Sequence, residues 1–350
     1  MRISVIGLGK LGAPLAAVLA SKGHKVIGVD VDDRPIRLIN EGKAPVYEPG
    51  LEALIQASRE RLWATSDYDL AVRETEATFI IVPTPSDESG AFSLRYVLAA
   101  AESIGQALRH KDGYHLVVLT STVMPGATGS ELLPALETHS GKRCGRDFGL
   151  CYNPEFIALG SVIHDMLNPD FVLIGESDPH AGDILTGIYR NLCENNPPIA
   201  RMNFINAELT KLALNTFVTT KISYANMLAE VCERLPGADV DVVTSALGLD
   251  SRIGRKYLKG AIGYGGPCFP RDNLAFIHLA RQLGVQAVLA EATDRLNRAQ
   301  IVRLAEIVLS RLPKGGRVGI MGLSYKPNTD VIEESQGVQL ARHLLARGIP

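Results

Sequence analysis

The sequence predicts an α/β fold that begins with a parallel sheet covered by helices on both faces and continues into a helical region. Short apolar runs alternate with amphipathic stretches from the first residue, and this alternation is typical of parallel sheets with crossover helices. The expected strands are Ile3–Ile6, Lys25–Asp30, Thr78–Val82, Leu116–Thr120, Phe148–Tyr152 and Phe171–Ile174.

The spacing of apolar residues changes in the middle of the chain. From Asn203 to about Arg234 no strand-like run occurs, and apolar residues repeat every three to four positions, which predicts one long helix. Because such a helix exceeds the usual globular length, we expect it to connect domains or to form a subunit contact.

The last fifty residues predict the start of another α/β unit, with a strand at Arg317–Leu323 and a helix at Ser335–Arg347. One strand and one helix cannot bury their own apolar faces, so we expect this segment either to be truncated or to pack against something else. The expected domains are 1–202, a central helical region at 203–300, and the beginning of a C-terminal domain at 301–350.

Composition excludes several classes of protein. The net charge is −2, with 46% hydrophobic and 21% charged residues, which is ordinary for a globular domain and gives no basic excess for nucleic acid. The five cysteines are odd in number and contain no C-x-x-C pair, so we expect neither a disulfide framework nor a metal site, and a reducing, cytoplasmic location. No apolar stretch is long enough for a membrane span, and no secretion signal is recognised.

A dinucleotide-binding turn is predicted directly after the first strand. Gly7, Gly9 and Gly12 form G-x-G-x-x-G at the start of a helix, where the glycines permit a tight turn, a close approach to a pyrophosphate and close helix packing. Asp30 ends the second strand, where an acid binds the ribose of NAD and would repel the 2′-phosphate of NADP. The first domain is therefore expected to be of the Rossmann type and to bind NAD. The alternative is a Gly-rich turn in a protein that binds no nucleotide, and Arg34 is either a contact on the adenosine side or a solvated residue.

Three more loops follow strands at the carboxyl edge of the predicted sheet, where open sheets bind ligands. One contains Thr84 and Pro85, and another contains Thr122; both offer hydroxyls and stiff backbone, although either is equally explained as a turn. The third contains Glu155, which is either a base or a cap.

The segment Gly263–Asp272 (GYGGPCFPRD) points to covalent chemistry. Its glycines allow a tight loop, and Cys268 falls at the predicted start of a helix, where the pKa of a thiol is lowered and the thiolate is a better nucleophile. Asp272 lies one turn further on. The alternative is a buried structural cysteine beside a capping aspartate.

The long helix places Lys211 and Asn215 four residues apart on one face. Both side chains donate hydrogen bonds, so together they are candidates for stabilising an oxyanion. The alternative is a solvated lysine beside a polar neighbour.

The motifs together resemble the UDP-glucose dehydrogenase / GDP-mannose dehydrogenase family. The resemblance covers nearly all of the chain and rests on GLGKLG, EPGL, VPTPSDESG, STVMPG, NPEF, AELTKLALNTF, DSRIG, GYGGPCFPRD and GLSYKPNTD, in this order. It implies two Rossmann-like domains joined by a long helix and a homodimer formed through the central region. This chain would hold the first domain, the central region and the start of the second.

The resemblance also implies roles for individual residues. It implies that Cys268 is the nucleophile, that Lys211 and Asn215 stabilise oxyanions, and that Asp272 and Thr122 position or activate water. The cofactor residues that it implies are Gly7, Gly9, Leu11, Gly12, Asp30, Arg34, Thr84, Pro85, Thr122 and Lys326. The implied substrate residues are Glu155, Phe156, Ile157, Lys211, Asn215, Arg252 of a neighbouring subunit, Tyr257, Lys259 and Gly265.

Two positions depart from the family pattern. Many members have a glutamate where this chain has Leu159, so its acid–base role is expected to fall to Asp272 through water, or to Lys211. Many members also have an arginine where this chain has Glu333, so the cofactor contact of that arginine is not carried over.

The expected reaction is oxidation of a primary alcohol to a carboxylate with two NAD. A thiol is needed because it holds the aldehyde as a thiohemiacetal and then as a thioester. UDP-glucose is the favoured substrate, and UDP-N-acetylhexosamines and GDP-mannose are the alternative substrates. The alternatives are a two-electron NAD dehydrogenase, which needs no cysteine, and a non-catalytic NAD-binding module.

Overall fold

The computed structural model describes residues 1–350, which form two compact units. The first unit comprises residues 1–87 and 92–211, and the second comprises residues 88–91 and 212–350. The α/β class is confirmed, because the first unit contains one large sheet and the second contains only helices and loops.

The sheet of the first unit has eight strands in the order β3-β2-β1-β4-β5-β6-β7-β8. The strands are β1 (Arg2–Ile6), β2 (Lys25–Val29), β3 (Leu62–Thr65), β4 (Ala77–Ile80), β5 (His115–Leu119), β6 (Phe148–Tyr152), β7 (Val172–Glu176) and β8 (Ile199–Met202). Neighbouring strands are parallel except β6 and β7. The carboxyl ends of β1 to β6 therefore share one edge.

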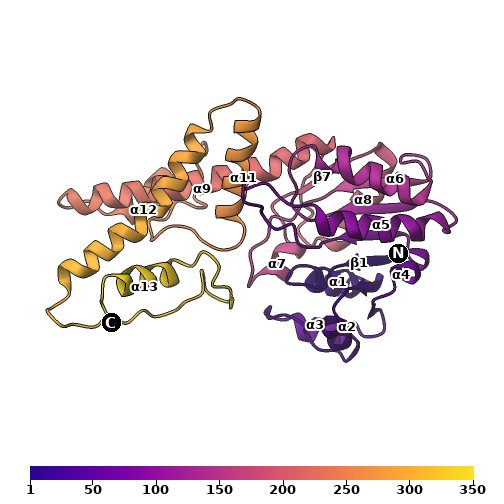
Figure 1. The fold of residues 1–350 in the computed structure, drawn as a ribbon, viewed down its shortest axis with the longest axis horizontal. Coiled ribbons are helices and arrows are strands. Elements are labelled where there is room, and N and C mark those ends of the chain that lie inside the picture. Colours follow the sequence, from indigo (N-terminus) through magenta and orange to yellow (C-terminus); the bar gives the residue numbers. More distant parts are fainter. The chain divides into compact units, whose positions relative to one another are not determined.

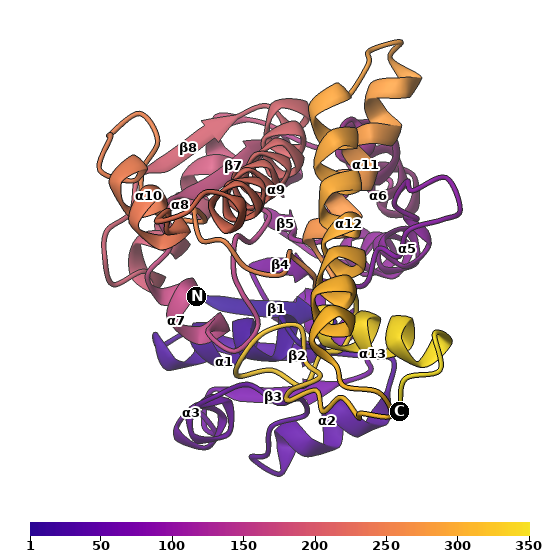
Figure 2. The ribbon, with the colours of Figure 1, turned by 90° about the vertical axis from the view of Figure 1, so that its left-hand side faces the viewer.

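Helices cover both faces of this sheet (Figure 2). They are α1 (Gly12–Ser21), α2 (Asp33–Asn40), α3 (Leu51–Ala57), α4 (Tyr68–Glu74), α5 (Arg95–Arg109), the π-helical turn η1 (Thr128–Leu132), α6 (Leu133–Ser140), α7 (Val162–Leu167) and α8 (Pro179–Leu192). Two buried clusters result, one with α1, α3, α7 and α8 and the other with α4, α5 and α6.

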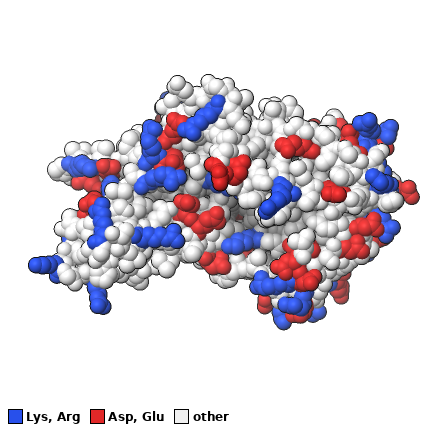
Figure 3. All heavy atoms as spheres, in the orientation of Figure 1, with Lys and Arg blue, Asp and Glu red and all other residues white.

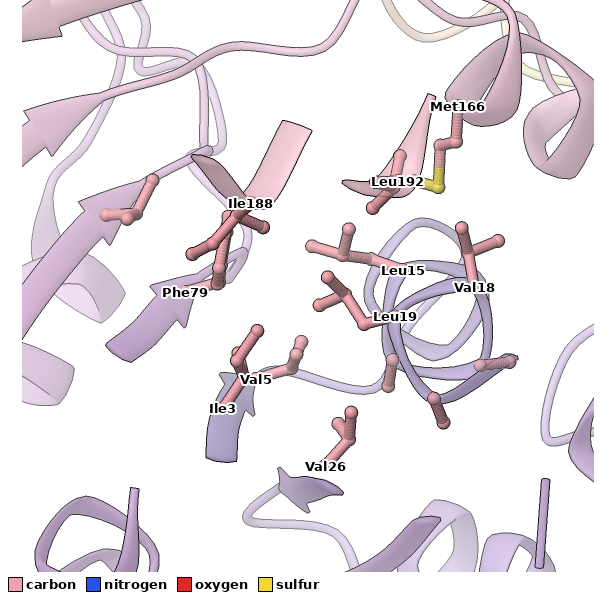
Figure 4. Close-up of a cluster of buried hydrophobic side chains, with 14 of the residues drawn as sticks. Ile3, Val5, Leu15, Val18, Leu19, Val26, Phe79, Met166, Ile188 and Leu192 are labelled. Carbon is pink, nitrogen blue, oxygen red and sulfur yellow. The ribbon is translucent and has the colours of Figure 1, made fainter. Parts of the chain in front are cut away.

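The strand periodicity explains the two clusters. Successive strand residues point to opposite faces, and accordingly Leu116 and Val118 lie in the first cluster while Val117 and Leu119 lie in the second. Figure 4 shows part of the first cluster, where side chains of α1 meet those of the strands. Because both faces are buried, these strands read as continuous apolar runs, which is why most were recognisable in the sequence.

The second unit is built from helices (Figure 1). They are α9 (Phe204–Arg234), whose residues 204–211 belong to the first unit, α10 (Val240–Leu247), α11 (Phe269–Gln282), α12 (Val288–Arg311) and α13 (Gln336–Ala346). Small apolar clusters join α11 to α12 and α12 to α13. The predictions of one long helix near 203–234, of a helix after Cys268 and of a helix near 335–347 are confirmed.

The predicted strand at Arg317–Leu323 is wrong. Val318 and Ile320 do pack against the cluster of Ala305, Leu340 and Leu344, and Met321 is fully exposed. However, no neighbouring strand supplies a ladder, and the Val318 N–H donates to the carbonyl of Pro350 instead. Apolar alternation reports which side chains are buried, whereas a strand also needs a partner for its backbone.

The turn between β1 and α1 depends on glycine at position 12. A Cβ added there would lie 1.8 Å from the Gly7 carbonyl oxygen and 2.8 Å from Cγ2 of Ile81. A Cβ added at Gly9 would meet no heavy atom within 4 Å. The two glycines of the same turn therefore differ in what the fold requires of them.

We predict that Gly12→Ala lowers the free energy of unfolding of the first unit by about 1–3 kcal/mol or more, because the methyl group forces backbone apart. Gly9→Ala is the matched control and should change it by less than about 0.5 kcal/mol. The single tryptophan, Trp63 in β3, makes denaturant unfolding followed by fluorescence a measurement on this unit. Equal losses in the two variants would contradict the packing argument.

Candidate active site

The β1–α1 turn is held by the end of β2. Asp30 follows β2, and its carboxylate accepts the N–H of Leu8 at 2.7 Å and that of Asp32 at 3.0 Å. The N–H of Gly7 donates to the Val29 carbonyl at 2.7 Å. Asp30 is thereby oriented beside the turn, and since a carboxylate has about four acceptor positions, it keeps capacity for ribose hydroxyls.

These residues fit a dinucleotide. The space beside Gly9 is open, and α1 begins at Gly12, with Leu11 at its N-cap, so its first N–H groups are placed for a pyrophosphate. Arg34, in the first turn of α2, donates to the Pro45 carbonyl at 3.4 Å. A cavity of about 580 Å³ is lined by Arg34 and residues 44–50, 52 and 53.

The loops after β4 and β5 are tied to each other. Thr84 Oγ1 donates to the Thr122 carbonyl at 2.7 Å, and Ser121 Oγ donates to the Val82 carbonyl at 2.6 Å. The Pro85 carbonyl accepts the N–H of Ser93 at 2.9 Å. The structure thus brings the predicted residues Thr84, Pro85 and Thr122 to adjacent strand ends.

A buried carboxylate on α9, Glu208, holds the same edge. Its two oxygens accept the N–H of Gly126 at 2.5 Å and that of Thr128 at 2.8 Å. Burial raises the pKa of Glu208, and these hydrogen bonds oppose that shift. No local sequence pattern indicates this contact, because Glu208 and Gly126 are 82 residues apart.

Glu155 lies after β6 in a largely apolar setting. The Tyr189 hydroxyl lies between Asn153 Oδ1 and Glu155 Oε1, the latter at 3.2 Å. A hydroxyl has one proton and serves one acceptor, so a protonated Glu155 is favoured because it can donate to the tyrosine oxygen. Burial raises the pKa of Glu155 to about 7, and Tyr189 and Lys211 oppose the shift.

Lys211 contacts the same loop through the backbone. Its Nζ donates to the Glu155 carbonyl at 2.6 Å and lies 4.6 Å from the centre of the Phe156 ring. An ammonium group has three N–H donors, so Lys211 retains donors for a ligand. Ile157 packs against the first apolar cluster.

Leu159, which stands where many members of the resembled family have a glutamate, is part of the apolar core. Leu159 packs against the same apolar cluster, so this position offers no acid. The backbone beside it is held by Glu48, whose carboxylate accepts the N–H of Gly160 at 2.8 Å and that of Val162 at 2.9 Å. Glu48 belongs to the EPGL motif, but nothing in that motif indicated its partner 112 residues away.

In the second unit, Cys268 is exposed at the N-cap of the 14-residue helix α11. The positive end of a helix lowers the pKa of a thiol and so favours the thiolate. The N–H of Asp272 donates to the Cys268 carbonyl at 2.8 Å. No two of the five cysteines form a disulfide.

Asp272 and Asn215 form a buried pair. Asn215 Nδ2 donates to Asp272 Oδ2 at 2.6 Å, and Arg271 lies 3.3 Å from Asp272 Oδ1. Asp272 is fully buried, and Asn215 is nearly so. The structure therefore brings two predicted residues together one helical turn from Cys268.

Of the other predicted residues of this unit, Arg252, Tyr257, Lys259 and Gly265 lie between α10 and α11, and Lys326 lies between α12 and α13. A cavity of about 460 Å³ is lined by Asp241, Thr244, Ser245, Arg255, Tyr257, Leu258 and Lys259. Arg252 is 87% exposed and pairs with Asp250 at 2.7 Å. Gly265 is buried, and Lys326 Nζ lies 6.0 Å from the centre of the Tyr325 ring.

The surface charges are mixed in sign. On the face in Figure 3, Lys and Arg are interspersed with Asp and Glu rather than gathered into a basic stripe. No group of three or more His, Cys, Asp or Glu side chains is placed to hold a metal ion. None of the helices combines the length and apolar character needed to cross a bilayer.

We predict that Glu155→Gln removes a pH-dependent loss of stability. With a folded-state pKa of about 7 and an ordinary value of 4.5, the folded wild-type chain binds the proton more tightly. Its stability therefore falls as pH rises from 4.5 to 7, whereas the neutral glutamine is insensitive. The difference in unfolding free energy, followed by Trp63 fluorescence, should grow over this window and level off above it. A difference that stays constant with pH would contradict the shifted pKa.

Two segments of the chain match domains of one known family. Residues 1–193 match the NAD-binding domain of the UDP-glucose/GDP-mannose dehydrogenase family, and residues 205–299 match its central domain.

Individual relatives cover almost the whole chain. UDP-glucose 6-dehydrogenase AglM of Haloferax volcanii is 40% identical over 99% of this chain and 81% of its own length. GDP-mannose 6-dehydrogenase of Pseudomonas aeruginosa is 38% identical over 99% and 79%. The solved structure of a UDP-glucose dehydrogenase from Pyrobaculum islandicum has a TM-score of 0.91 at 39% identity, covering 99% of this chain and 80% of that one. The chain belongs to the UDP-glucose/GDP-mannose dehydrogenase family of NAD-dependent nucleotide-sugar 6-dehydrogenases.

Proposed function

We propose that the chain oxidises the primary alcohol of a nucleotide sugar to a carboxylate, most specifically UDP-glucose to UDP-glucuronate, through covalent intermediates on Cys268. The observation that carries the proposal is the exposed thiol at the N-terminus of α11, one turn from the buried Asp272–Asn215 pair. UDP-glucose is supported by the similarity to two UDP-glucose dehydrogenases. GDP-mannose and UDP-N-acetylhexosamines are the alternative substrates.

The residues of the β1–α1 turn, with Asp30, would hold NAD, which supplies the hydride acceptor for each of two oxidations. The alcohol first loses a hydride and a proton to become an aldehyde. The Cys268 thiolate adds to the aldehyde carbon, and the resulting oxyanion takes a proton to give a thiohemiacetal. Loss of a second hydride and a proton gives a thioester.

Water completes the reaction. It attacks the thioester carbon, the C–S bond breaks, and Cys268 leaves as thiolate while the product leaves as carboxylate. One alcohol, two NAD and one water thus give one carboxylate, two NADH and three protons.

The proposed roles follow donor and acceptor chemistry. Lys211 and Asn215 donate to the oxyanions, since each has N–H groups beyond the one that already bonds within the chain. Asp272, with Thr122, handles water and its proton, because Leu159 offers no acid; Lys211 is the alternative group for this role.

The substrate residues proposed in the first unit are Glu155, Phe156 and Ile157. Those proposed in the second are Arg252, Tyr257, Lys259 and Gly265. Tyr257 and Lys259 line the cavity of about 460 Å³, which supports a nucleotide-sugar contact there. Lys326 is proposed on the cofactor side.

We predict two NADH per sugar consumed when UDP-glucose, GDP-mannose and UDP-N-acetylhexosamines are tested as a panel, with UDP-glucose giving the highest kcat/KM. One NADH per sugar, with aldehyde as product, would establish a two-electron dehydrogenase instead. NAD binding without turnover of any sugar would establish a non-catalytic module.

Two variants test the residues that this mechanism requires. Cys268→Ser should keep the fold and NAD binding but abolish carboxylate release, because an alkoxide is far harder to generate than a thiolate. Lys211→Ala should raise the barrier by about 3 kcal/mol, as expected for one lost oxyanion donor. A serine variant with a normal rate and two NADH per sugar would eliminate the covalent mechanism.

We further propose that a second copy of the chain packs along α9. Phe217, Tyr224 and Val231 are spaced by seven residues, and they are 68%, 47% and 53% exposed. A spacing of seven places side chains on one stripe of a helix, and such an apolar stripe is typical of an interface. Arg252 would then serve the substrate of the neighbouring subunit.

We predict a dimer by light scattering and a monomer for the double variant Phe217→Glu with Val231→Glu, because like charges that face one another across the stripe repel and cannot be buried. Leu283→Glu, at a position 70% exposed after α11, is the matched control and should remain dimeric. A wild-type monomer with full activity would rule out both the interface and the shared Arg252.

A further inference from the structure

The loop that leads to Cys268 is held by one side chain of α12. Asn297 Oδ1 accepts the N–H of Tyr264 at 2.8 Å, and Asn297 Nδ2 donates to the Tyr264 carbonyl at 2.9 Å. Both backbone polar groups of a single loop residue are thus satisfied by one amide. A primary amide suits this task because it presents a donor and an acceptor side by side, as a neighbouring peptide group would.

The loop is shaped to admit this amide. A Cβ added at Gly263 would lie 2.5 Å from Asn297 Oδ1, and Gly263 has a φ of +107°, which side chains rarely adopt. Glycine at this position therefore serves the approach of Asn297.

Tyr264 is linked to the Cys268 thiol through the packing of its ring against Phe269. Tyr264 is 4% exposed, and its ring meets that of Phe269 edge-on, with centres 6.3 Å apart. Phe269 directly follows Cys268 and is the first residue of α11. A displacement of Tyr264 would therefore be transmitted to the residue that sets the start of the helix.

Two single hydrogen bonds flank the amide pair. Asn226 Oδ1 accepts the N–H of Ala261 at 2.8 Å, and the Glu333 carbonyl accepts that of Gly266 at 3.0 Å. Each holds one N–H, whereas Asn297 holds both groups of Tyr264. Asn297 is accordingly the side chain on which the conformation of the loop depends most.

We propose that Asn297 is a positioning residue for the Cys268 thiol: through Tyr264 it holds the thiol at the N-terminus of α11, where the helix favours the thiolate. The inference rests on the proposed function in one respect, that Cys268 is the nucleophile. It assigns Asn297 no contact with substrate or cofactor.

The test measures the thiol directly, by the rate at which iodoacetamide alkylates Cys268 in the full chain, read from the mass of the peptide that contains it. For Asn297→Ala we expect a rate about tenfold lower at neutral pH, a pH midpoint shifted upward, and a similar fall in kcat with little change in KM, since misplacement of a reacting group costs rate rather than binding. NAD affinity should be unchanged.

Gln300→Ala is the matched control. Gln300 is a buried amide one turn further along α12, and its Oε1 accepts from Arg303 at 3.2 Å. Its loss should leave alkylation at the wild-type rate even if the melting temperature falls. If Asn297→Ala fails to fold, Gly263→Ala disturbs the same contact from the loop and should give the same changes.

The outcomes separate this inference from the proposed function. An unchanged or faster alkylation rate with a wild-type pH midpoint, in whichever of these variants folds, would overturn the role of Asn297 alone, provided that Cys268→Ser is inactive. Full activity of Cys268→Ser would overturn the proposed nucleophile, whatever the alkylation rates.

Discussion

The backbone N–H groups of the loops around the candidate site need acceptors, and the places of these acceptors determine how the loops lie. Loops have no ladder partners, and an unpaired buried N–H is costly. Here side chains from distant elements supply the acceptors. The side-chain oxygens of Asp30, Glu48, Glu208 and Asn297 accept the backbone N–H groups of Leu8, Gly160, Gly126 and Tyr264, respectively. The loops that carry the expected chemistry are therefore fixed by side chains from distant elements, of which Asp30 is also a proposed NAD contact.

The acids of the first unit differ in their hydrogen-bond partners. Glu208 and Glu48 each accept two backbone N–H groups and so hold the loops that contain those groups. Glu155 has the Tyr189 hydroxyl as its hydrogen-bonded neighbour, and burial raises its pKa to about 7. Glu155 is the one acid between Asn153 and Gly160, since Leu159 in the same loop is apolar and packs against the first cluster.

The sequence predicted those features that depend on local pattern. The glycine turn after β1, the long helix α9 and the start of α11 at Cys268 were readable because periodicity and turn chemistry are local. The edge strands β3 and β8 were missed because neither is a continuous buried run: in β3 only Leu62 and Ala64 are buried, and β8 has no buried residue. Arg317–Leu323 was misassigned because alternation does not reveal whether a partner strand exists. The contacts of Glu48, Glu208 and Asn297 join residues 33 to 114 positions apart, so no local pattern could indicate them.

We propose that the sugar is held covalently on Cys268 while it is oxidised. This can be tested by quenching the wild-type enzyme with acid during turnover of UDP-glucose and NAD and measuring the mass of the peptide that contains Cys268. We expect a fraction of that peptide to carry the mass of the oxidised nucleotide sugar and to lose it on treatment with hydroxylamine, as a thioester does. A peptide that stays unmodified at every time point while NADH accumulates would contradict it.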